Sequence, residues 1–155
     1  MNLLCIDPGP KKSGVIIFDG NHILFNVSDM GNDDIIEYND FYSCRHLAIE
    51  GVACYGMAVG ASVFNTCISI GRFIQAFKGM QQTIIYRKDV KMCLCHNMRA
   101  KDANIRQAIL DRFPATGGGK TPQVGTKKQP GPLFGISKHA WSALAVGITY
   151  FEENK

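Results

Sequence analysis

Long apolar runs, a basic leader and a regular cysteine framework are all missing from this chain of 155 residues. No stretch approaches the roughly 20 consecutive apolar residues that a membrane helix needs, which excludes a membrane-spanning protein. The first residues carry no basic segment and already reach an acid at Asp7, unlike a signal peptide. The six cysteines stand mostly inside apolar runs, so we expect reduced, packed thiols. Together these absences predict a cytoplasmic protein without a membrane partner.

Acidic residues are absent from Ala115 to Lys138, a stretch that holds six glycines and three prolines. This composition predicts a flexible loop at about 115–136. Three lysines of this loop, Lys120, Lys127 and Lys128, and Lys101 at the end of a second basic stretch from Arg87 to Lys101 are the candidates for contact with a polyanion. The net charge of +4 is modest, but its uneven distribution favours binding to a polyanion. An ordinary solvated surface is the alternative.

The spacing of apolar residues predicts a mixture of strands and helices. Strands are expected at 2–7, 14–19, 22–27, 46–51 and 83–86. Helices are expected at 60–77, 88–95, 100–113 and 137–153, with a short one within 31–44. Tight turns join the first three strands into an antiparallel meander. We therefore expect one α/β domain over 1–155, in which a mixed five-stranded sheet of this meander plus parallel strands is flanked by helices.

Two carboxylates stand where short apolar strands are expected to end. Asp7 follows the apolar run Leu3–Ile6 and precedes a Pro/Gly turn, and Glu50 ends the run that begins at His46. An acid at the end of a buried strand is costly unless it is paired or bound to a metal. Neighbouring parallel strands would place both acids side by side, which favours a divalent-cation site for phosphoryl chemistry. For Asp7 alone, a structural role in starting the turn is the alternative.

Three sequence blocks together resemble one protein family. They are Ile6-Asp7-Pro8-Gly9 with Ser13-Gly14, then LAIEGV at 47–52, then ALAVGIT at 143–149. In order, spacing and expected context they are similar, over nearly the whole chain, to RuvC-type Holliday junction resolvases of the ribonuclease H-like superfamily. The small size resembles a bacteriophage member. The first block alone also resembles actin-like ATPases, but those need a second nucleotide-binding half that this length cannot hold.

The resemblance implies a homodimer that binds four-way DNA junctions and nicks two strands with Mg²⁺ or Mn²⁺, with two ions expected, in a bacterial or phage-infected cell. Asp7 and Glu50 match the family's first two catalytic acids. His139 and Ser142 stand where the family has an acid or histidine followed by an aspartate. An imidazole can bind a metal or act as a general base, although His139 as a purely structural residue is the alternative. Asp102, at the start of the preceding helix, is the candidate spare acid.

Ser142 is the departure from the family pattern, because a hydroxyl is a poor ligand for a hard cation. Three explanations remain open: adjusted metal ligands, an enzyme that relies on Asp7, Glu50 and His139, or an impaired site. The last of these keeps an alternative function open. In that alternative, the same fold grips branched DNA and cuts it weakly or not at all.

The resemblance also suggests where DNA and a second subunit would bind. Tyr55 follows the second acid and is the candidate for stacking on a base, with core packing as the alternative. The four lysines named above, Lys101, Lys120, Lys127 and Lys128, are expected to contact backbone phosphates, which gives affinity without sequence information. The helix at 60–77 is the expected dimer surface, although its apolar spacing fits a monomer's core equally well.

Overall fold

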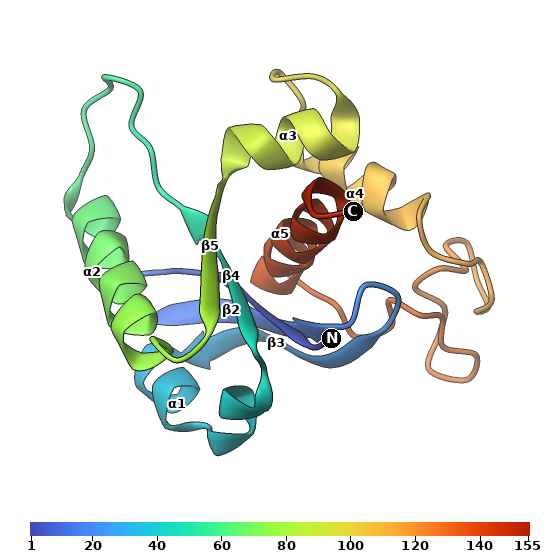
Figure 1. Ribbon diagram of the computed structural model, residues 1–155. Coiled ribbons are helices and arrows are strands. Elements are labelled where there is room, and N and C mark those ends of the chain that lie inside the picture. The colour runs from blue at the N-terminus through green and yellow to red at the C-terminus, as the bar shows by residue number, and fades with distance from the viewer.

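A mixed sheet forms the centre of the computed structural model, which describes residues 1–155 (Figure 1). The five strands stand in the order β3-β2-β1-β4-β5. Their bounds are β1 Leu3–Asp7, β2 Lys12–Phe18, β3 Ile23–Gly31, β4 His46–Gly51 and β5 Gln81–Tyr86. The first three strands pair antiparallel, whereas β4 pairs parallel with both β1 and β5. The predicted mixed α/β sheet, a three-stranded meander plus parallel strands, is confirmed.

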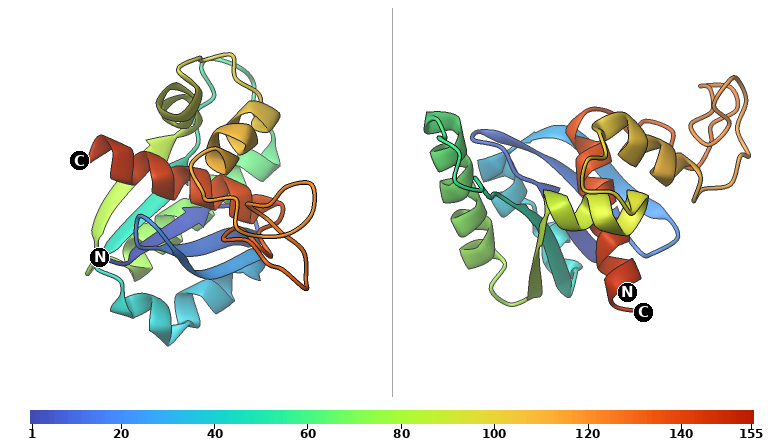
Figure 2. Two further views of the ribbon diagram at one scale, coloured as in Figure 1. Left: turned by 90° about the vertical axis from the view of Figure 1, so that its right-hand side faces the viewer. Right: turned by 90° about the horizontal axis from the view of Figure 1, so that it is seen from above.

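Helices cover both faces of this sheet (Figures 1 and 2). On one face lie α1 (Asn32–Glu37), a 3₁₀ turn (Asn39–Ser43) and α2 (Ala61–Ala76). On the other lie α3 (Arg87–Cys95), α4 (Asp102–Leu110) and α5 (His139–Glu153). The α4 helix is shorter than the predicted 100–113: it begins after its N-cap Lys101 and gives way to a turn after Leu110. Pro114 disfavours helical backbone at Phe113. None of these helices combines the length and the apolar character needed to cross a membrane.

Alternation along β1 divides the buried side chains between two cores. Leu3 and Cys5 point toward α5 and belong to the core that α3, α4 and α5 share. Leu4 and Ile6 point the other way, into a core built with α1 and α2. The faces of the sheet are therefore filled, and the ends of the strands are left for polar side chains.

The α5 helix crosses the sheet at close range (Figure 2). Gly147 makes this possible, because a Cβ there would stand 2.6 Å from the sulfur of Cys5 on β1. Gly14 does the same at the beginning of the helix, where a Cβ would stand 2.4 Å from the backbone oxygen of His139. Because Gly14 is the register partner of Asp7, this close approach brings the start of α5 next to the end of β1.

The α2 helix turns part of its apolar surface outward. Its buried residues are Thr66, Ser69 and Phe73, whereas Phe64 and Ile68 are each 61% exposed. Only part of the apolar face of this helix is therefore buried in the core of the monomer. Two large hydrophobic side chains of the helix are left in water, and exposed apolar patches often mark binding surfaces.

The basic segment predicted as a flexible loop at 115–136 contains no helix and no strand of the sheet. Backbone bonds nevertheless tie it together: Gly118 N–H donates to Gln129 O (2.9 Å) and Leu133 N–H donates to Gln123 O (2.9 Å). Leu133 is fully buried. These contacts favour a defined shape, and the flexibility of the loop stays a prediction.

Candidate active site

Asp7 and Glu50 meet at the carboxyl ends of β1 and β4. The strands are parallel, and Ile6 is the register partner of Ile49, so the residues that follow them stand next to each other. Both side chains are mostly buried, with 15% of Asp7 and 14% of Glu50 exposed. The sequence prediction that the two strands would place these acids together agrees with this arrangement. We call them the acid pair.

Burial gives the acid pair unusual proton affinities. Loss of water around Glu50, together with the neighbouring negative charge of Asp7, raises the pKa of Glu50 to about 8. Burial also raises the pKa of Asp7, although a hydrogen bond with His139 and the charge of that ring partly oppose it. Two buried carboxyls at such close range resist carrying two negative charges unless a cation neutralises them. The acid pair therefore has the chemistry of a binding site for a hard divalent cation.

His139 is the first residue of α5, and its ring lies against Asp7. The distance from His139 Nδ1 to Asp7 Oδ2 is 3.0 Å, and the ring is 60% exposed. Lys138, just before it, has a left-handed backbone (φ +41°), which is uncommon for a residue with a side chain. The hydroxyl of Ser28 on β3 donates to the carbonyl of Ser137 (2.9 Å) and so holds this connection against the sheet. The strained entry to α5 thus sets the direction of the imidazole.

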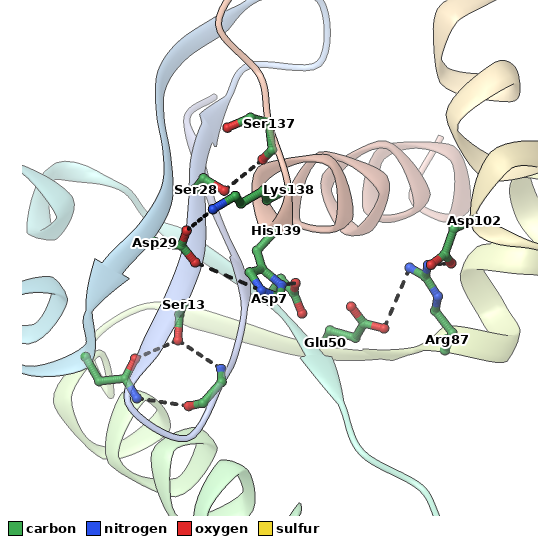
Figure 3. A network of polar contacts seen from close by, with 12 residues as sticks. Asp7, Ser13, Ser28, Asp29, Glu50, Arg87, Asp102, Ser137, Lys138 and His139 are labelled. Atoms are coloured by element: carbon green, nitrogen blue, oxygen red, sulfur yellow. Dashed lines mark hydrogen bonds and ion pairs between the residues drawn. The ribbon is translucent and has the colours of Figure 1, made fainter. Parts of the chain in front are cut away.

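Asp29 also reaches the site, and sequence reasoning missed it. Its carboxylate lies 4.0 Å from His139 Nε2 and 3.6 Å from Lys138 Nζ (Figure 3). The pairing of β2 with β3 shifts register between Ser13 and Val15, so that β3 carries one extra residue opposite Gly14. Such bulges redirect side chains. No signal in the sequence marks the bulge, which is why an aspartate on an edge strand could not be assigned to the site.

A buried polar network fixes the turn between β1 and β2. The backbone N–H of Gly9 donates to Ser13 Oγ (3.1 Å), and the Ser13 hydroxyl donates to Asn32 Oδ1 (2.7 Å). The amide nitrogen of Asn32 donates to Gly9 O (3.0 Å) and to Ser69 Oγ on α2 (2.9 Å). Because every partner is satisfied, the network holds the Pro/Gly turn rigidly beside Asp7 (Figure 3).

Arg87 stands between Glu50 and Asp102 (Figure 3). Its Nη1 lies 3.9 Å from Glu50 Oε1, and its Nη2 pairs with the carboxylate of Asp102. Asp102 is 88% exposed, so the arginine separates the candidate spare acid from the acid pair. Ser142 lies one helical turn after His139 and lines a cavity together with Arg87 and Asp102. The structure therefore brings Asp7, Glu50 and His139 together, and it places Asp102 and Ser142 beside them around Arg87.

The residues predicted to contact DNA are all at the surface. Tyr55 is 63% exposed, with a left-handed backbone (φ +49°), so core packing is excluded for its ring. Lys101 precedes α4, and the remaining lysines lie in the 115–136 segment. The exposed residues of this group are Lys101, Lys120, Lys127 and Lys128. In Figure 1 the segment that carries Tyr55 and the basic segment extend on opposite sides of the molecule.

The donor set of the site suits Mg²⁺ or Mn²⁺, which need few protein ligands, better than a metal ion whose coordination sphere consists wholly of side chains. No three side chains of His, Cys, Asp or Glu converge as a complete coordination sphere. Mg²⁺ is commonly held by one or two carboxylates, while water and substrate phosphate oxygens complete its shell. Asp7 and Glu50 would supply those carboxylates, with His139 Nδ1 at the edge.

Sheet order, paired acids and the helix that begins at His139 define an α/β protein with a ribonuclease H-like fold. Two solved structures of RuvC from Thermus thermophilus share it. RuvC in complex with Holliday junction substrate has a TM-score of 0.70 at 15% identity, covering 99% of this chain and 94% of that chain. The other RuvC structure has a TM-score of 0.68 at 17% identity, covering 99% and 95%. The predicted likeness to RuvC is thereby confirmed at the level of the fold.

No protein-family model matches the chain, and no curated protein matches it. The likeness to a bacteriophage member stays a prediction.

Proposed function

We propose that this chain is a metal-dependent endonuclease that hydrolyses phosphodiester bonds in branched DNA, four-way junctions above all. The observation that carries the proposal is the acid pair: two buried carboxyls whose pKa values are raised by burial, at the same edge of a fold shared with RuvC. The segment from Ala115 to Lys138, which contains no acid and several lysines, offers positive charge for a DNA backbone.

In this proposal each residue has a distinct task. Asp7 and Glu50 would hold one or two Mg²⁺ or Mn²⁺ ions through their carboxylates. A bound divalent cation polarises the phosphate and lowers the pKa of water, which is the chemistry it supplies to hydrolysis. His139, 3.0 Å from Asp7, carries a proton at Nδ1 or adds a ligand there. Arg87 screens Glu50 from the exposed carboxylate of Asp102.

Asp29 is expected to orient His139 from the side opposite Asp7. A carboxylate beside one ring nitrogen fixes which nitrogen carries the proton and where the other one points. We expect Asp29→Asn to lower junction cleavage by about 10-fold, within the range known for such outer partners. Single-turnover cleavage of a labelled junction measures it. Asp33→Asn is the matched control, because Asp33 is also an aspartate paired with one basic residue, Arg72. Equal cleavage rates for the wild type, Asp29→Asn and Asp33→Asn would show that Asp29 has no part in the mechanism.

A homodimer formed through α2 would let two active sites act on two strands. Phe64 and Ile68 are exposed on this helix and supply an apolar contact surface. We expect Phe64→Asp to convert the dimer into monomers and to abolish paired nicking of a junction, without loss of fold. Leu24→Asp is the control, because Leu24 is 53% exposed on the edge strand β3. Sedimentation equilibrium measures the oligomeric state of the wild type and of both variants. A wild-type protein that sediments as a monomer would contradict the proposed dimer.

A binding protein that does not cut is the second candidate, and Ser142 is the observation that favours it. A hydroxyl replaces the carboxylate that the family resemblance places there, and the cavity beside it contains arginines. The two functions separate in one experiment: labelled four-way junction and matched linear duplex are incubated with the protein, with Mn²⁺ or with a chelator. Paired nicks in the junction that need Mn²⁺ support the nuclease. Tight junction binding with no nick at any Mn²⁺ concentration supports the binding protein.

A further inference from the structure

A cavity of about 540 Å³ lies between α4 and the beginning of α5, beside the acid pair. Its walls include Arg87, Asp102, Arg106, Trp141 and Ser142. Asp7, Glu50 and His139 do not line it, so the proposed chemistry leaves this space unused. We call it the α4–α5 cavity.

Arg106 gives the cavity a prepositioned positive charge. Its guanidinium carbon lies 4.6 Å from the centre of the Trp141 ring, which is the geometry of a cation–π contact. Arg106 is exposed and makes no ion pair, so no carboxylate neutralises its charge. A planar guanidinium that is held on an aromatic face and keeps its donors free is well suited to a phosphate, which it can bind through two parallel hydrogen bonds.

Arg87 links the cavity to the acid pair. It lines the cavity, yet its Nη1 is only 3.9 Å from Glu50. That same nitrogen is buried and has no hydrogen-bond partner, which is rare for a buried donor. Arg87 therefore touches both the acid pair and the cavity that Arg106 lines.

Ser142 makes the wall of the cavity less negative than an aspartate would. It lines the cavity with a neutral hydroxyl at the position where the family resemblance places an aspartate. A carboxylate there would repel an anion, whereas the hydroxyl can donate a hydrogen bond to one. Against two guanidinium groups the wall then carries one acid, Asp102, which is paired to Arg87.

We propose that the α4–α5 cavity seats a backbone phosphodiester of DNA next to the one that is cut. The inference rests on the proposed function for its choice of DNA as the ligand. Arg106 and Arg87 bind the phosphate oxygens, Trp141 holds Arg106 in place, and Ser142 favours the anion instead of a cation. Ser142 thereby belongs to substrate binding and not to the metal site.

The fluorescence of Trp141 tests the cavity directly, because it is the only tryptophan of the chain. A short single-stranded oligonucleotide is titrated into the protein in the presence of a chelator, and inorganic phosphate is titrated in a second arm. We expect a saturable change in emission with the oligonucleotide and none with phosphate at matched concentrations. The change should be lost in Arg106→Gln and kept in Arg45→Gln, since Arg45 is exposed just before β4, at the opposite end of that strand from Glu50. An equal response to inorganic phosphate, or an unchanged response in Arg106→Gln, overturns the proposal.

Junction affinity supplies the second test, again with a chelator so that nothing is cut. Arg106→Gln is expected to weaken binding about 10-fold and to reduce the salt dependence by about one phosphate contact. Arg106→Lys, which keeps the charge without the planar fork, should restore the salt dependence but not the full affinity. Unaltered melting temperatures for both variants show that the fold is intact. Full affinity and salt dependence in Arg106→Gln overturn the proposal.

Failure of this inference and failure of the proposed function give different results. If Mn²⁺-dependent nicking is observed but Trp141 emission does not change on addition of DNA, the cavity assignment is wrong and the nuclease assignment is supported. If emission and affinity respond as expected but no nick forms, the cavity binds DNA and the nuclease assignment is wrong.

Discussion

Replacing Asp7 by asparagine is expected to lower junction cleavage by about 1,000-fold or more while leaving junction binding intact. The large effect follows because a divalent cation contributes several kcal/mol of transition-state stabilisation, and each 1.4 kcal/mol is about a factor of ten in rate. An amide keeps the shape of the side chain but cannot balance the charge of a cation. Binding is spared, since removal of one buried negative charge does not weaken contacts to a polyanion.

The measurement pairs single-turnover cleavage in Mn²⁺ with a binding titration in chelator. Asp40→Asn serves as the control, because Asp40 is an exposed aspartate on the 3₁₀ turn that packs on the opposite face of the sheet. Cleavage by Asp7→Asn at more than about a tenth of the wild-type rate would place the cation elsewhere, because such a loss is worth only about 1.4 kcal/mol.

Replacing Glu50 by glutamine is expected to stabilise the metal-free fold at alkaline pH, by about 2–4 kcal/mol. The pKa of Glu50 is about 8 in the folded protein against an ordinary value of 4.5. Between these values the folded state binds more protons than the unfolded state, so the free energy of unfolding falls as the pH rises. Glutamine carries no charge and removes this loss, so the variant gains over the wild type as the pH approaches about 9.

Urea unfolding at about pH 4 and about pH 9, without metal, checks this expectation. Near pH 4 the two proteins should be equally stable, because Glu50 is then largely protonated in both states. Addition of Mn²⁺ at the higher pH should stabilise the wild type and not the variant, since a ligand stabilises only the state that binds it. Glu37→Gln, at the exposed end of α1, is the control. A wild type that is more stable than Glu50→Gln at about pH 9 without metal would mean that Glu50 is not an electrostatic burden on the fold.

Much of the fold could be predicted because the apolar residues of its strands and helices follow simple periodicities. The apolar run of β1 alternates between two cores, and the helix that begins at His139 buries residues at helical spacing. Asp7 and Glu50 were predictable for the same reason. Each ends an apolar strand, and parallel strands bring their carboxyl ends to one edge of the sheet.

The parts that escaped prediction depend on register and on contacts between distant elements. Asp29 reaches His139 only because β3 carries an extra residue opposite Gly14. Asp102 forms an ion pair with Arg87 and does not join the acid pair. The spacing of residues along the chain does not reveal which of these partners it contacts. The outward face of α2 was ambiguous as well, because a dimer surface and a core have the same apolar spacing.

The cation site at Asp7 and Glu50 is tested most directly by calorimetric titration of Mn²⁺ into the protein near neutral pH. Two buffers with different heats of protonation give the number of protons released. The predicted result is binding with release of about one proton, held by Glu50 whose pKa is about 8, and loss of that binding in Asp7→Asn. Binding that releases no proton, or that is unchanged in Asp7→Asn, would contradict a metal site built on these two acids.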